Sequence, residues 1–126
     1  SAFCRKEHIP YICAGNGALC TAVLPAVYRK GKTVVAVSSQ GASPAASARL
    51  RDMLSKHVPD NMDAILDRMS EIREISKKTF RSQQVRRSYL HACLDEMLNA
   101  GRPVDDSEEL LIRQEISDKY REDVVL

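Results

Sequence analysis

The spacing of apolar residues changes once along this chain of 126 residues, from short runs to a helical period. In the first part, runs rich in β-branched and apolar residues predict short strands at 9–14, 23–28 and 33–38. Only four residues, Gly31 among them, separate the last two strands, and this predicts a hairpin.

A helix is expected to begin where the strand at 33–38 gives way to small residues. Ser43 followed by Pro44 is a helix-start signal, because a serine hydroxyl caps the first turn and proline suits its first position. This helix should run to about residue 57 and bury one apolar face. The face comprises Ala46, Leu50, Met53, Leu54 and His57.

The rest of the chain has a helical period. Residues 60–98 are expected to be helical throughout, with a bend or break at 82–84. The segment 99–103 contains a glycine and a proline and stops the helix. Asp105 and Asp106, each with a glutamate three positions on, resemble a capping box and start a last helix. That helix carries Leu110, Leu111 and Ile116.

The N-terminal elements amount to half of an α/β repeat. Residues 1–8 are expected to end a helix that precedes the strand at 9–14, and 18–23 to form a helix after it. Half a repeat cannot build a sheet that is covered on both faces. The chain also has no initiator methionine. We therefore expect the strand to pair with another chain, or the N-terminal part of a larger domain to be missing. The fold class is an α/β remnant followed by a mainly α region.

Composition excludes several classes of protein. Apolar residues make up 44% and charged residues 29%, which argues against a disordered or membrane-spanning chain. Aromatic residues make up 5% and tryptophan is absent, which argues against a stacking platform for nucleic acid. The thiols and imidazoles lack metal-ligand spacing, and no signal peptide is visible, so a reducing, cytoplasmic location is expected. They are Cys4, Cys13, Cys20, Cys93, His8, His57 and His91.

Charge is unevenly distributed. Residues 1–57 carry eight Lys or Arg and two acidic residues, whereas 58–126 carry eleven and fifteen. The first part therefore suits an anionic ligand, and the second resembles a solvated helical surface. A basic stretch on the long helical segment is either such a solvated face or a contact for an anionic ligand or a partner subunit. It consists of Lys77, Lys78, Arg81, Arg86 and Arg87.

Two glycine-containing loops follow predicted strands. Gly15-Asn16-Gly17 lacks the third glycine of a dinucleotide fingerprint, and no acidic residue follows about 20 positions later, so we interpret it as a βα turn. The loop at 38–44 ends at a helix N-terminus, where backbone N–H groups and the helix dipole favour an anion. A carboxylate or phosphate site and a merely capped loop remain equally open there.

The central part of the chain resembles a known family. Residues 36–44 read A-V-S-S-Q-G-A-S-P, residues 48–51 read A-R-L-R, and L-P-A stands upstream at 24–26. This pattern resembles the precorrin-2 dehydrogenase / sirohydrochlorin ferrochelatase family, which includes the N-terminal module of sirohaem synthase. The resemblance covers about residues 3–98 and is strongest over 19–54.

The resemblance implies an enzyme of sirohaem biosynthesis. Such enzymes bind NAD on an N-terminal Rossmann domain and oxidise precorrin-2, a multiply carboxylated tetrapyrrole, to sirohydrochlorin. Many also insert ferrous iron. It implies an intertwined homodimer without nucleic-acid or membrane partners. The implied domains are the end of the Rossmann domain at 1–24, a dimerisation segment at 25–57 and a helical domain at 58–126. The fragment alone should bind no NAD and be inactive.

The resemblance also implies site residues. Ser39 matches a serine that lines the substrate cleft and is phosphorylated in some members. The substrate-binding set is Ser38, Ser39, Gly41, Ser43, Pro44 and Arg49. The family's catalytic aspartate corresponds to Gly15, with Asn16 beside it, and neither can accept a proton at neutral pH. The alternative is therefore a non-catalytic homologue that binds a tetrapyrrole or forms dimers.

Overall fold

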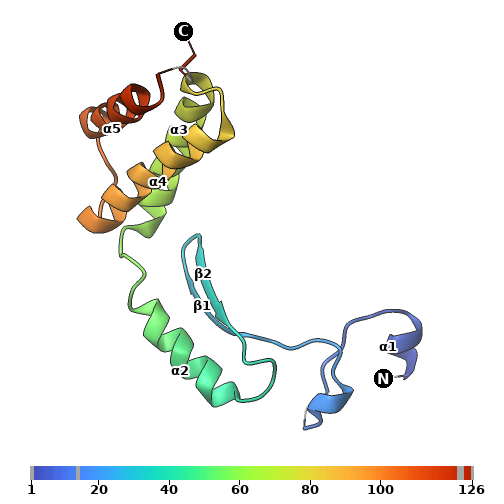
Figure 1. Cartoon of the computed structure of the whole chain (residues 1–126). Coiled ribbons are helices and arrows are strands. Elements are labelled where there is room, and N and C mark those ends of the chain that lie inside the picture. The colour runs from blue at the N-terminus through green and yellow to red at the C-terminus, as the bar shows by residue number, and fades with distance from the viewer. Residues whose placement is uncertain (1, 14, 122–123, 126) are drawn as a thin grey trace. The chain divides into compact units, whose positions relative to one another are not determined.

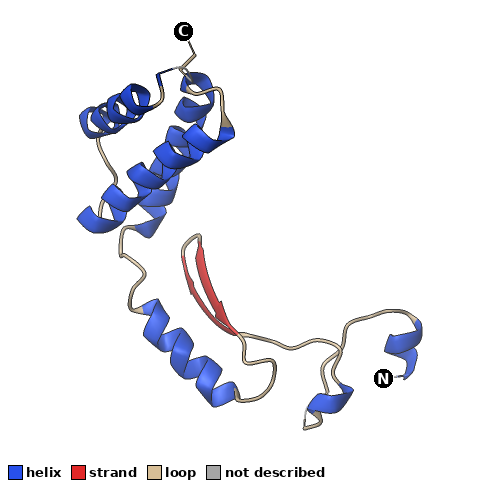
Figure 2. Cartoon of the chain, in the orientation of Figure 1, coloured by secondary structure: helices blue, strands red, loops and turns tan. Residues whose placement is uncertain are grey.

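The computed structural model describes residues 2–13, 15–121 and 124–125, and the chain forms two compact units, 1–58 and 59–126. The elements of each unit can be followed in Figures 1 and 2. In chain order they are α1 (Ala2–Lys6), a 3-10 turn (Gly17–Leu19), β1 (Ala26–Lys30), β2 (Thr33–Val37), α2 (Pro44–Ser55), α3 (Met62–Thr79), α4 (Gln83–Ala100) and α5 (Asp106–Lys119). A small two-stranded sheet followed by a helical region confirms the expected fold class.

The hairpin of the first unit is confirmed. Strands β1 and β2 are antiparallel, in a register that pairs Ala26 with Val37 and Lys30 with Thr33. Gly31 opens the two-residue turn with a φ of 55°, a left-handed value that glycine adopts without steric cost. A glycine at this position of a two-residue turn matches the twist of the flanking strands.

Helix α2 contacts both strands through small residues. Ser47 is its only buried residue, whereas Leu50, Met53 and Leu54 are each about half exposed. The expected apolar face is therefore not buried within this unit. The least exposed positions of α2 are Ser47, Ala48, Arg51 and Ser55, which share one side of the helix.

The N-terminal segment differs from the prediction. Residues 9–13 form no strand, and residue 14 lies outside the described part of the chain. Instead of a helix at 18–23 there is only the 3-10 turn. Thr21 donates its N–H to the Tyr11 carbonyl at 3.0 Å, which closes a loop. A strand needs a run of backbone partners, and the Tyr11 N–H donates instead to the Thr21 side chain at 2.9 Å, so residues 9–13 and 21 form no ladder.

The second unit contains the core. Its fully buried apolar side chains come from α3, α4 and the segments that follow them: Ile65, Ile72, Phe80, Val85, Tyr89, Cys93, Met97 and Val104. The long helical segment breaks as expected, but at residues 80–82 and not at 82–84, because Gln83 and Gln84 already belong to α4. The Ser82 side chain caps α4 by accepting from the Val85 N–H at 3.2 Å. The capping box at Asp105 and Glu108 is also confirmed.

A buried polar contact joins α4 to α5. The Tyr89 hydroxyl donates to the Glu109 carboxylate, which is 3% exposed and lies 3.3 Å from the Arg113 Nε. Burial, together with this hydrogen bond, raises the pKa of Tyr89, and burial raises the pKa of the Cys93 thiol to about 11. Both groups therefore stay protonated at neutral pH, and Glu109 keeps its donor. No helix of the described residues is both long enough and apolar enough to cross a membrane.

We expect Tyr89→Phe to destabilise the second unit by about 1–3 kcal/mol, because the buried Glu109 carboxylate loses a hydrogen-bond donor. Urea unfolding followed by circular dichroism measures the change. Tyr120→Phe is the matched control, since it removes a hydroxyl that makes no hydrogen bond among the described residues. Equal stability of the two variants would contradict the role given to this contact.

Candidate functional site

The loop between β2 and α2 is built around the start of the helix. Ser43 caps α2, because its side chain accepts a hydrogen bond from the Ala46 N–H at 3.2 Å. Pro44 occupies the first helical turn, where its missing N–H costs nothing. These two residues therefore have the local roles that the sequence predicted for them.

Ser39 clamps this loop to the helix start. Its hydroxyl accepts from the Ser43 N–H and donates to the Ser43 carbonyl, each at 3.0 Å. The Ser47 hydroxyl lies 2.9 Å from the same oxygen. The single proton of the Ser39 hydroxyl is thus already used within the protein. Attaching a phosphate to this oxygen would break the donation to Ser43.

Two consecutive residues in the loop between β2 and α2 have left-handed backbone angles. Gln40 has a φ of 54° and Gly41 a φ of 84°. A Cβ at Gly41 would meet nothing within 4 Å, so its φ and not a lack of space explains the glycine. A left-handed backbone is less favourable for Gln40 than it would be for glycine. The Gln40 N–H donates a hydrogen bond to the Ser38 hydroxyl at 3.1 Å.

A cavity of about 230 Å³ lies inside the first unit beside this loop. It is lined by Val23, Leu24, Pro25, Ala26, Ser38, Ser39, Gly41, Pro44 and Ser47. Four of the residues expected to bind substrate, Ser38, Ser39, Gly41 and Pro44, are thus brought together around one space. Ser38 is exposed, and its hydroxyl proton has no acceptor among the described residues. Ser38 is therefore better suited than Ser39 to donate to a ligand.

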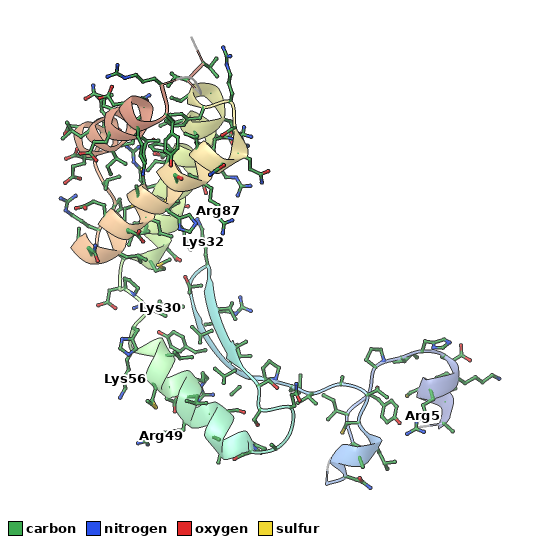
Figure 3. The ribbon with its side chains drawn as sticks, viewed as in Figure 1. Arg5, Lys30, Lys32, Arg49, Lys56 and Arg87 are labelled. Atoms are coloured by element: carbon green, nitrogen blue, oxygen red, sulfur yellow. The ribbon has the colours of Figure 1, made fainter. Side chains whose placement is uncertain are left out.

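The remaining candidates lie elsewhere in the unit. Ser43 acts through the helix cap and does not line the cavity. Arg49 is exposed on α2, is not one of the lining residues, and extends away from the hairpin (Figure 3). A fixed carboxylate in the cavity would therefore be held by neutral donors and not by this guanidinium.

The loop that carries Gly15 and Asn16 holds no titratable acid. Gly15 has a φ of 82°, and Asn16 precedes the 3-10 turn with an exposed side chain that caps nothing. Only three residues of 3-10 helix follow, so there is no helix N-terminus to receive a pyrophosphate. This loop therefore lacks the helix N-terminus that binds the pyrophosphate of a dinucleotide. The described residues also contain no group of three His, Cys, Asp or Glu side chains able to hold a metal ion.

Sequence reasoning missed part of the cavity wall. Ser47 and the Val23–Leu24 pair line the space, yet none of them was selected as a site residue. A small polar residue four positions, and so about one helical turn, after the capping serine was the available signal for Ser47. No signal in the sequence alone singles out Val23 or Leu24.

Most of the chain is similar to siroheme synthases. The siroheme synthase of Nitrosomonas europaea is 32% identical over 106 residues, covering 81% of this chain and 22% of the relative. That of Nitrosospira multiformis is 28% identical over 124 residues, covering 95% and 26%. That of Saccharophagus degradans is 26% identical over 89 residues, covering 71% and 19%.

The chain thus spans about a fifth to a quarter of the length of these curated relatives. No protein-family model matches it, and no solved structure does.

We expect Ser39→Ala to speed hydrogen exchange of the Ser43 amide by about tenfold or more, because that amide loses its acceptor. Amide exchange followed by NMR measures the rate. Ser38→Ala serves as the control, since Ser38 bonds to Gln40 and leaves Ser43 untouched. An unchanged rate in Ser39→Ala would show that the clamp does not hold the loop.

Proposed function

We propose that this chain belongs to a siroheme-biosynthesis enzyme of the precorrin-2 dehydrogenase type, which oxidises precorrin-2 to sirohydrochlorin. The observation that carries the proposal is the similarity to siroheme synthases over most of the chain, including the segment that forms the cavity. The reaction removes a hydride and a proton from the tetrapyrrole. The proposal concerns the longer protein, because the chain spans only part of its relatives.

The cavity supports recognition of one arm of a carboxylated substrate. Its volume of about 230 Å³ lies below the 300–1,000 Å³ typical of pockets for whole small molecules. A tetrapyrrole would therefore place only a carboxylate side chain in it. The Ser38 hydroxyl can donate to that carboxylate, while Val23, Leu24 and Pro25 contact its methylene groups.

The cofactor would be bound outside the described residues. NAD supplies the hydride acceptor when bound, and the loop at Gly15 does not fit it. Ferrous iron would be a second substrate of the same protein, inserted after the oxidation. Phosphorylation of Ser39 and a cytoplasmic location stay predictions.

A non-catalytic homologue is the second candidate function. It is favoured by one observation, the absence of a carboxylate at Gly15 and Asn16, where the resembled family has its catalytic aspartate. Under this alternative the protein binds a tetrapyrrole or holds a dimer together and does not turn over.

The proposal predicts that the longer protein, given precorrin-2 and NAD, produces the absorbance change of sirohydrochlorin formation. Asn16→Asp should accelerate the reaction by about 10²-fold or more, because it restores a general base. Position 16 is the better choice, since its φ of −141° suits any residue whereas Gly15 is left-handed. Asn16→Gln is the control. Activity only in Asn16→Asp would favour the non-catalytic alternative, and activity in neither would refute the enzyme.

We also propose that the first unit forms a homodimer. A lone two-stranded hairpin is marginally stable, and this unit buries no apolar side chain among its described residues. Val27 and Val34 stand on the exposed face of the hairpin, at 46% and 44% exposure. Leu50, Met53 and Leu54 form a second exposed apolar face on α2. Pairing with a second copy would bury these side chains.

Light scattering at micromolar concentration should therefore give about twice the chain mass of 14.1 kDa. Val34→Lys should shift the protein to a monomer, because it places a second cation opposite Arg29 on the hairpin. Leu111→Lys, at a 61% exposed position of α5, is the control and should leave the dimer intact. A wild-type monomer would contradict the dimer.

A further inference from the structure

A second, larger cavity lies within the second unit, along the seam between α3 and α4. It measures about 620 Å³, within the range of pockets for whole small molecules. Its lining residues are Met69, Arg73, Ser76 and Lys77 from α3, and Gln83, Arg86, Arg87, Leu90, His91 and Leu94 from α4. We call this space the α3–α4 groove.

The groove combines an apolar floor with a cationic rim. Met69, Leu90 and Leu94 are partly buried and pack against the core. Three of the cations lie near the end where α3 stops and α4 starts: Lys77 is in the last turn of α3, and Arg86 and Arg87 are the fourth and fifth residues of α4. Arg73 lines the groove further back on α3. A molecule in the groove would therefore meet apolar atoms on the floor and cations along the rim.

Two arginines of the rim have no counter-ion among the residues that the structure describes. Neither Arg86 nor Arg87 makes an ion pair among the described residues, and Figure 3 labels Arg87 on α4. Lys77 alone is paired, with Glu74 at 2.6 Å. Among the described residues, no acidic side chain lines the groove, although residues 59–126 carry fifteen acidic residues against eleven Lys or Arg. The positive lining therefore departs from the charge of its own unit.

We propose that the α3–α4 groove is a binding site for an amphipathic organic polycarboxylate, a molecule with an apolar body and two or more carboxylates. Arg86 and Arg87 bind the carboxylates, and Leu90, Leu94 and Met69 contact the body. Guanidinium groups pair with carboxylates in a bidentate geometry, which suits this role. No aromatic residue lines the groove, so it offers no stacking surface for nucleic-acid bases. The inference follows from the groove alone and holds whether or not the protein oxidises precorrin-2.

Binding is tested on the 126-residue chain with coproporphyrin III, a flat tetracarboxylate, by fluorescence anisotropy at 150 mM salt. We expect saturable binding at least about tenfold tighter than that of citrate, which has carboxylates but no apolar body. A tetracationic N-methylpyridyl porphyrin of similar size should not bind. Equal binding of the cationic porphyrin or of citrate would overturn the proposal, and so would the absence of coproporphyrin binding.

Two charge-matched double variants locate the site. Arg86→Gln with Arg87→Gln should weaken coproporphyrin binding by about tenfold or more. Lys78→Gln with Arg81→Gln removes the same charge from exposed positions outside the groove and should change it less than about twofold. Equal losses would mean general electrostatic attraction and overturn the site. Circular dichroism checks that both variants keep their helices.

Methionine methyl NMR gives a readout that needs no variant. The chain has four methionines, and only Met69 lines the groove. Coproporphyrin should shift the Met69 methyl signal and leave that of the buried Met97 in place. A shift confined to Met53 on α2, or weaker binding in Ser38→Ala with no effect at Arg86 and Arg87, would place the ligand in the first unit. That result would overturn this proposal and leave the proposed function standing. If the wild-type chain self-associates and the Arg86→Gln, Arg87→Gln variant does not, the groove binds a second copy of the protein. That result would also overturn the proposal.

Discussion

The burial of apolar side chains is confined to one part of the described chain, between Ile65 and Val104. Of the residues described in the first unit, only Ser47 is buried, while several large apolar side chains of α2 and the hairpin are exposed. Hydrophobic burial is the main favourable term in folding. Hydrophobic burial therefore stabilises the second unit directly. The first unit depends on hydrogen bonds and on burial of its exposed apolar faces by a partner.

Within the first unit, a serine network takes over the positioning role that a core has elsewhere. Ser39, Ser43 and Ser47 hold the loop after β2 against the start of α2 at distances of 2.9–3.2 Å. This network fixes one wall of the cavity, and every described residue that lines the cavity is uncharged. It also explains why Ser38, the serine outside the network, retains a hydroxyl proton for a ligand.

Local signals were read correctly from the sequence, and signals that depend on distant partners were not. The Ser43 cap, the Gly31 turn and the Asp105 capping box depend on neighbouring residues, so they could be predicted. The Ser82 cap was not predicted, although the break beside it was. The strand predicted at 9–14 was wrong over residues 9–13, because a strand needs a ladder of backbone partners and this segment has backbone contact with Thr21 only at Tyr11. The apolar face of α2 was assigned from periodicity alone, which identifies an amphipathic helix but not what its apolar side contacts.

In the candidate site, too, the features that depend on neighbouring residues could be predicted, and those that depend on the tertiary structure could not. Ser39 and Gly41 could be anticipated from the loop and from the family resemblance, whereas their place beside Leu24 depends on the tertiary structure. The basic stretch on the helical segment was left open between a solvated face and a ligand contact. Arg86 and Arg87 share the groove with Leu90, while Lys78 and Arg81 lie outside it. Charge alone did not separate these two sets.

The acidic stretch after Pro103 is part of the helical body and not a detachable tail. Glu109 in its middle is buried against Tyr89, Asp106 pairs with Arg68 at 2.6 Å, and Val125 donates its N–H to the Thr79 carbonyl at 2.8 Å. If a protease cut between α4 and α5 and α5 dissociated, the core residues that α5 covers would be exposed. A shorter homologue without α5 would need another segment to cover the same side of the core.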